Sequence, residues 1–158
     1  MERITSFSID HTRLKPGLYV SRLDSFGGVE ATTFDLRLKT PNGGEYLTTA
    51  ASHTFEHLGA TFLRNDPEFK TKTIYFGPMG CRTGFYAVFF GIYDSEGMSQ
   101  LFVDMCSFIE SFEGEVPGTK EAECGNCADH DLIKVKAEAS AYKSVLESLS
   151  EETSQYPV

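Results

Sequence analysis

The chain has 158 residues, of which 41% are hydrophobic and 13% aromatic, which excludes a disordered segment and predicts a single globular domain over residues 1–158. The formal net charge is −9, the opposite of the balance that binds phosphate backbones, so we expect no nucleic-acid partner. No stretch approaches the roughly 20 apolar residues of a membrane helix, and the start MERITSFSID lacks the apolar region of a signal peptide, so we expect a cytoplasmic protein without membrane contact.

The first third of the chain is predicted to form strands. Residues 1–16 indicate an irregular arm, and residues 17–23 a short strand. From residue 29 to 40, hydrophobic residues alternate with charged ones, and PNGG then ends the segment as a turn. This period of two is typical of a half-buried strand. The inward positions are Phe34, Leu36 and Leu38, and the outward positions are Asp35, Arg37 and Lys39.

The remaining chain alternates between helices and strands. Residues 48–64 are predicted to form a helix, because apolar residues recur there at helical spacing. The aromatic runs 71–77 and 84–94 are bounded by glycine and are typical of strands. Two further helices are predicted from the spacing of Leu101 to Phe112 and of Leu132 to Leu149. This order favours the α+β class, an antiparallel sheet with helices packed on one face.

The segment HTFEH places two histidines four residues apart in the first predicted helix. At about 100° per residue, His53 and His57 lie about 40° apart on the helix, close enough for one cation to bridge both rings. They point nearly opposite to the helix's apolar stripe of Ala51, Phe55, Leu58 and Phe62. Glu56 lies beside this position, which suits a base better than a ligand.

Two readings of HTFEH remain open at this point. The histidines can be solvated or core residues without a ligand. The order H-x-x-E-H also matches the inverzincin peptidases, in which the glutamate activates a zinc-bound water. That reading needs a third ligand, usually a downstream carboxylate, and a cleft for a peptide.

Cys124 and Cys127 form a C-x-x-C pair in EAECGNCADH. A redox pair would need a preceding βαβ unit, and a zinc finger a second pair of ligands, for which only His130 is near. One thiolate can instead join His53 and His57. Such a His₂Cys set leaves a coordination position open, as in catalytic metal sites, and suits Zn, Fe(II) or Co(II).

Cys81 lies between glycines in GPMGCRTGFY, at a predicted turn before a strand. A lone cysteine is most often a small buried hydrophobe. Arg82 is adjacent, and we expect it to help lower the pKa of the thiol, which would make a thiolate available for proton transfer. Cys106 is predicted to pack in or near the core.

Together, five segments resemble the S-ribosylhomocysteine lyase (LuxS) family. They are SFSIDHT, FDLRLKTPN, HTFEH, GPMGCRTGFY and ECGN, in the family's order and spacing, from about residue 5 to about residue 130. The resemblance implies cleavage of S-ribosylhomocysteine to homocysteine and 4,5-dihydroxy-2,3-pentanedione, the precursor of the quorum-sensing signal autoinducer-2. It also implies a small α+β homodimer with two active sites at the subunit interface, each with one divalent metal. Fe(II) is the expected ion, and Zn(II) or Co(II) can substitute.

The resemblance also assigns roles to individual residues. The metal ligands would be His53, His57 and Cys124, with Cys127 left as a structural residue. The two acid–base residues would be Glu56 and Cys81. The sugar would be held by Ser6, His11 and Arg37, and Arg64 would lie near the amino-acid end of the substrate. The chain departs from the family at Tyr75, where many members carry an acidic residue, so no carboxylate at this position can accept a hydrogen bond from the substrate ammonium.

Three functions are therefore carried forward. The first is the metal-dependent carbon–sulfur lyase. The second is an inverzincin-like metallopeptidase. The third is a non-catalytic zinc-binding module built on Cys124, Cys127 and two histidines.

Overall fold

The computed structural model describes residues 8–157, and its sheet confirms the α+β prediction. Four antiparallel strands run in the order β1-β2-β4-β3 and share one core with the helices. The strands are β1 (Gly17–Phe26), β2 (Val29–Arg37), β3 (Thr73–Pro78) and β4 (Gly84–Phe90). The helices are α1 (Thr49–Asn65), α2 (Ser95–Ser111), α3 (Leu132–Glu147) and α4 (Glu151–Ser154). No helix in this described range is both long and apolar enough to cross a membrane.

One face of the sheet forms the core. In the register of the strands, Leu18 pairs with Leu36 and Leu36 with Phe85, and all three are fully buried. Because side chains alternate across a strand, Phe34 and Leu36 face the helices while Asp35 and Arg37 face the other way. The predicted alternation in β2 is therefore confirmed.

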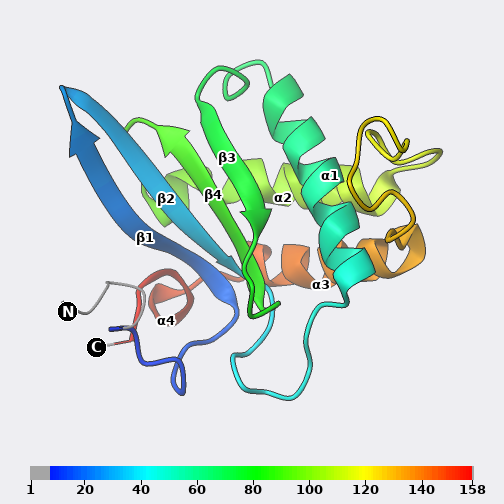
Figure 1. Cartoon of the computed structure of the whole chain (residues 1–158). Helices are drawn as coiled ribbons and strands as arrows, with labels where there is room; N and C mark the ends of the chain where they lie inside the picture. The colour runs from blue at the N-terminus through cyan, green and yellow to red at the C-terminus, as the bar shows by residue number, and fades with distance from the viewer. Residues whose placement is uncertain (1–7, 158) are drawn as a thin grey trace, which may run out of the picture.

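The three long helices lie together on the core side of the sheet (Figure 1). Helix α1 begins where the Thr48 hydroxyl accepts a hydrogen bond from the Ala51 N–H, a typical N-cap. The Phe55 ring of α1 stacks on Phe85 of β4, with ring centroids 4.6 Å apart. Cys106 of α2 is fully buried, as expected, and burial raises the pKa of its thiol.

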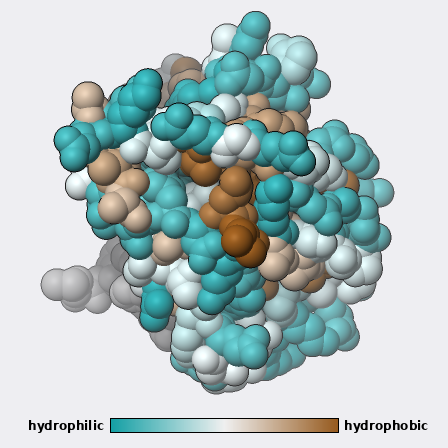
Figure 2. Space-filling model, turned by 90° about the vertical axis from the view of Figure 1, so that its right-hand side faces the viewer, coloured by the Kyte–Doolittle hydropathy of each residue, from teal (hydrophilic) through white to brown (hydrophobic). Residues whose placement is uncertain are grey.

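Helix α4 was not predicted, because four residues are too few to show a helical period. It packs beside β1, near residues 8–16 (Figure 1). A Cβ atom on Gly17 would lie 2.1 Å from the backbone oxygen of Thr153, so only glycine allows this close approach. The face seen in Figure 2 is mostly hydrophilic, with a narrow apolar strip near its centre.

Candidate active site

Four side chains form one group of metal-ligating atoms. His53 and His57 come from α1, and Cys124 and His130 from the segment that joins α2 to α3. One ligand atom from each lies within 4.8 Å of the others, and all four residues are half-buried. Cys127 is not part of this group. The donor set of imidazoles and one thiol fits a divalent transition metal.

The two α1 histidines have their tautomers set by main-chain carbonyls. The Nδ1 atom of His53 lies 3.0 Å from the Asp129 carbonyl oxygen, and that of His57 lies 2.8 Å from the Pro117 carbonyl oxygen. A carbonyl only accepts hydrogen bonds, so each Nδ1 carries the proton and each Nε2 keeps a lone pair for a metal. The Cys124 Sγ atom lies 3.4 Å from His53 Nε2.

His130 is a member of this group that the sequence analysis weighed only as a zinc-finger ligand. Its Nδ1 lies 3.1 Å from the Thr54 hydroxyl, which already donates to the Ala50 carbonyl at 2.8 Å. The hydroxyl has one hydrogen, so His130 Nδ1 donates to it. The Nε2 atom of His130 then keeps a lone pair, and it is buried without a hydrogen-bond partner. The visible signal was a histidine six residues after Cys124.

Ring geometry separates His130 from the other two histidines. An ion bound to an imidazole lies in the plane of the ring. His53 and His57 are nearly perpendicular, at 88° with centroids 4.6 Å apart, so their planes can meet at one ion. His130 stacks on His53 at 25° with centroids 4.1 Å apart. The rings of His53 and His57 can therefore direct both Nε2 atoms at one ion, while His130 stacks on His53 and lies at 72° to His57, with centroids 4.8 Å apart.

The segment between α2 and α3 follows a tight path over His57. Gly118 has a φ of +75°, a left-handed conformation that favours glycine, and a Cβ there would lie 3.3 Å from His57 Nδ1. The neighbouring Pro117 supplies the carbonyl that orients His57. The position of the metal-ligating atoms therefore depends on the backbone path of this segment.

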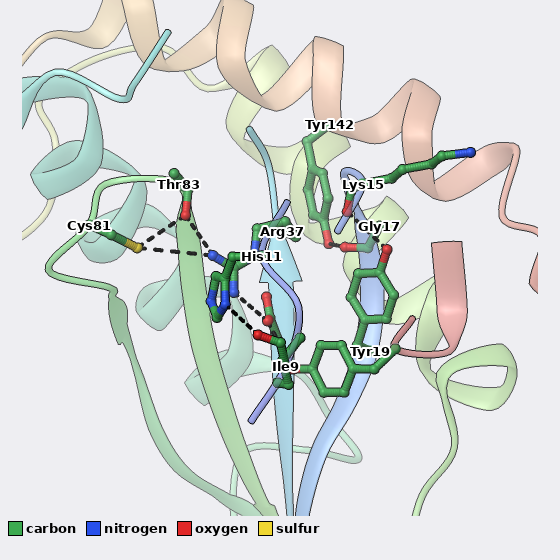
Figure 3. A network of polar contacts seen from close by, with 11 residues as sticks. Ile9, His11, Lys15, Gly17, Tyr19, Arg37, Cys81, Thr83 and Tyr142 are labelled. Atoms are coloured by element: carbon green, nitrogen blue, oxygen red, sulfur yellow. Dashed lines mark hydrogen bonds and ion pairs between the residues drawn. The ribbon is translucent and has the colours of Figure 1, made fainter. Parts of the chain in front are cut away.

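A second group of polar contacts surrounds Cys81, in the turn between β3 and β4 (Figure 3). Its exposed thiol lies 3.1 Å from the Thr83 hydroxyl and 4.0 Å from Arg37 Nη1, which in turn donates to Thr83 at 2.6 Å. Partial burial opposes ionisation of Cys81, but the hydrogen bonds of Thr83 and the charge of Arg37 outweigh it and lower the thiol pKa.

The expected role of Arg82 was wrong, and Arg37 occupies that place. The Arg82 guanidinium donates to the Leu47 carbonyl at 3.3 Å and lies over the Tyr46 ring. It therefore points toward the chain before α1 instead of toward the thiol. Adjacency in sequence did not predict this, because the Arg82 backbone is left-handed, with a φ of 59°.

Arg37 is held by a buried ion pair on the non-core face of the sheet. Its Nη2 lies 2.6 Å from Asp35 Oδ2, and the two residues are 2% and 1% exposed. The strand was predicted to be half-buried, but these two outward positions are buried as well. Burial raises the pKa of Asp35, although the charge of Arg37 opposes this change. Burial alone would lower the pKa of Arg37, but the charge and hydrogen bond of Asp35 lead to a raised pKa.

The remaining predicted site residues occupy different places. His11 lies close to Arg37, with its Nδ1 2.9 Å from the Ile9 carbonyl oxygen (Figure 3). Glu56 is half-buried on α1. Arg64, in the last turn of α1, donates to the carbonyls of Thr73 and Ile74 at 3.1 and 3.0 Å. Ser6 lies outside the described residues. Within residues 8–157, no hydrogen bond or ring contact joins the metal-ligating group to the Cys81 group.

Comparison with known proteins gives matches over nearly the whole chain. The model of the family described as S-Ribosylhomocysteinase (LuxS) matches residues 4–154. Proteins named S-ribosylhomocysteine lyase from several bacteria are similar to it. The one from Borrelia garinii subsp. bavariensis is 49% identical, over 99% of this chain and 100% of its own. Those from Desulfotalea psychrophila and Porphyromonas gingivalis are 50% and 49% identical, over 99% of both chains.

Proposed function

The chain belongs to the S-ribosylhomocysteinase (LuxS) family, and from this premise we propose that it is a carbon–sulfur lyase acting on S-ribosylhomocysteine. The products are homocysteine and 4,5-dihydroxy-2,3-pentanedione, the precursor of autoinducer-2. The observation that carries the proposal is the pairing of features in one chain. A His₂Cys group with set tautomers suits a catalytic metal, and a separate thiol with a lowered pKa suits proton transfer.

The substrate explains why both features are needed. It is a thioether on C5 of ribose, and a thiolate leaves poorly from an unactivated carbon. Moving the carbonyl from C1 to C2 and then to C3 makes the C4 proton acidic and places the sulfur β to the carbonyl. Loss of the C4 proton then expels the thiolate, which takes up a proton as homocysteine. Each shift only relocates hydrogen, so no external oxidant or reductant is consumed.

We assign the metal to His53 Nε2, His57 Nε2 and Cys124 Sγ, with Fe(II) expected and Zn(II) or Co(II) able to substitute. The bound ion supplies Lewis-acid stabilisation of negative charge on the sugar oxygens. The three residues leave one position open. The unpartnered Nε2 of His130 suits acceptance of a hydrogen bond from a hydroxyl at that position.

Two side chains are proposed to move the protons. Cys81, as a thiolate, takes a proton from one sugar carbon and returns it to the next during the carbonyl shifts. Glu56 acts on the C4 proton and on protons bound to oxygen. The charge of Arg37, 4.0 Å from the thiol, supports the thiolate form of Cys81.

Substrate binding and assembly complete the proposal. Ser6, His11 and Arg37 hold the sugar, and His11 acts electrostatically on Asp35, the partner of Arg37. Arg64 binds near the amino-acid end, where Tyr75 offers a phenol in place of a carboxylate. Two copies form a homodimer with the sites at the interface, which would bring the metal-ligating group and the Cys81 group of different subunits together. We place the enzyme in the cytoplasm.

A thiol-release assay tests the proposal. The purified protein, loaded with Fe(II) or Co(II), should release homocysteine from S-ribosylhomocysteine, measured with a thiol reagent. If the loaded protein releases none, the lyase proposal is lost. The peptidase alternative gains no support from the described residues, because the metal-ligating group contains a thiol and no carboxylate.

A further inference from the structure

Residues that follow α4 cover the buried Asp35–Arg37 pair. The Tyr156 hydroxyl donates to Asp35 Oδ2 at 2.9 Å, across 121 residues of sequence. Its ring lies parallel to that of Tyr19, with centroids 4.9 Å apart and 6° between the planes. Tyr19 and Asp35 pair across β1 and β2, so Tyr156 sits over this point of the sheet.

The chain just before Tyr156 is anchored against the start of β1. Gly17 lies against the Thr153 backbone, where no larger residue fits. Lys15 forms an ion pair with Glu152. The Tyr19 hydroxyl donates to the Lys15 carbonyl at 2.9 Å, and burial raises its pKa to about 12, so it stays a neutral donor. The position of Tyr156 is therefore determined by several independent contacts.

The Asp35 carboxylate depends on Tyr156 because it has few other partners. Its Oδ2 atom accepts from Arg37 and Tyr156, while its Oδ1 atom and Arg37 Nε are buried without partners. A buried charge with incomplete hydrogen bonding is costly, and removal of one donor increases that cost. Without the Tyr156 hydroxyl, Asp35 would keep only Arg37, and the pair would be free to rearrange.

The same pair controls the surroundings of the thiol. Arg37 donates from Nη2 to Asp35 and from Nη1 to Thr83. Arg37 and Thr83 both point toward the Cys81 thiol (Figure 3). The guanidinium is planar and rigid, so a shift at Nη2 moves Nη1 as well. Contacts therefore run without a break from Tyr156 through Asp35 and Arg37 to Cys81.

We propose that Tyr156 is a positioning residue for Cys81, acting through Asp35 and Arg37, so that the segment after α4 forms part of the catalytic site. For its activity readout, this inference rests on the proposed lyase function. The reactivity of the Cys81 thiol tests it independently of any substrate.

The test is Tyr156→Phe, which keeps the stacked ring and removes only the hydroxyl. The rate of Cys81 alkylation by iodoacetamide is followed across pH by mass spectrometry of the Cys81 peptide, in the metal-loaded protein. The pH midpoint should rise, and kcat/KM for thiol release should fall about threefold to tenfold, in line with the net contribution of a typical hydrogen bond. The metal content and melting temperature should stay near those of the wild type.

A matched control and a double variant make the test specific. Tyr93→Phe removes a phenol hydroxyl outside this network and should change neither readout. In an Asp35→Ala background, which removes the acceptor of the Tyr156 hydroxyl, Tyr156→Phe should add nothing, because its effect passes through Asp35. The proposal is overturned if Tyr156→Phe alkylates with the wild-type pH profile, or if its effect persists in full beside Asp35→Ala. A wild-type protein without lyase activity would refute the proposed function but leave the alkylation result decisive for Tyr156.

Discussion

The metal-ligating group and the Cys81 group are built by different means. The first uses neutral imidazoles whose protons point at main-chain carbonyls of one connecting segment. The second contains a buried pair of opposite charges, and the positive member of this pair contacts the thiol. The orientation of the metal ligands therefore depends on the backbone path of the connecting segment, whereas the pKa of the thiol depends on the balance of nearby charges. Substitutions should therefore separate metal binding from proton transfer.

Loss of a metal ligand should have the largest effect. Cys124→Ala removes one of three proposed ligands, so we expect loss of bound metal and at least a roughly 100-fold drop in thiol release. Metal content by elemental analysis is the direct measurement. Cys127→Ala is the matched control and should keep its metal. If Cys127→Ala loses metal and Cys124→Ala does not, the ligand assignment is wrong.

In the Cys81 group, loss of the thiol should greatly slow turnover. Cys81→Ala removes the proposed proton carrier, so thiol release should fall by about 10²- to 10⁴-fold. Metal content should equal that of the wild type, because Cys81 is not one of the metal-ligating residues. A Cys81→Ala protein without metal would show that the two groups are not independent.

Neutralising the buried Asp35 carboxylate should lower the stability of the fold and leave metal binding largely unchanged. Asp35→Asn leaves the Arg37 guanidinium buried without its counter-charge, at a cost of about 3–5 kcal/mol in the free energy of unfolding. Urea denaturation followed by circular dichroism measures this cost. The exposed pair Arg22–Asp24 offers a control, since Asp24→Asn should change stability by less than about 1 kcal/mol. Equal effects of the two substitutions would contradict the role given to burial.

A substitution of His130 tests whether this residue binds the metal or only supports the site. His130→Phe keeps a ring beside His53 but removes Nε2, so the Co(II)-loaded variant should keep its metal and its resting visible spectrum. Thiol release should fall about tenfold, as for a residue that supports a metal site without binding the ion. A changed resting spectrum or lost metal would instead make His130 a ligand.

The smallest expected effect is one of pH. The Cys81 pKa is lowered in the folded protein, so its alkylation midpoint should lie below the value for the unfolded chain. The thiolate's contribution to stability is then present above the unfolded pKa and is lost as the pH falls through the folded pKa. Comparing iodoacetamide rates in native protein and in urea gives both midpoints. Identical midpoints would remove the argument for a prepared thiolate.

Local patterns alone predicted much of the fold and, within the candidate site, the pairing of His53 with His57. The alternation in β2 placed Phe34 and Leu36 in the core, because side chains of a strand alternate between faces whatever packs on them. The spacing of His53 and His57 brought the two rings together, because helix geometry determines neighbours three and four residues apart. The short α4 and the last three residues of β1, which extends to Phe26, escaped prediction because neither carries a clear period.

Only the tertiary structure decided how distant residues complete the site. Cys124 reaches His53 across 71 residues, and Tyr156 reaches Asp35 across 121. It also decided that Arg37, rather than the adjacent Arg82, faces Cys81. A local period reports which face of an element a residue occupies, but which element packs against that face depends on the path of the whole chain. The sequence by itself therefore determined which side chains this protein offers for catalysis, and the packing determined which neighbours tune them.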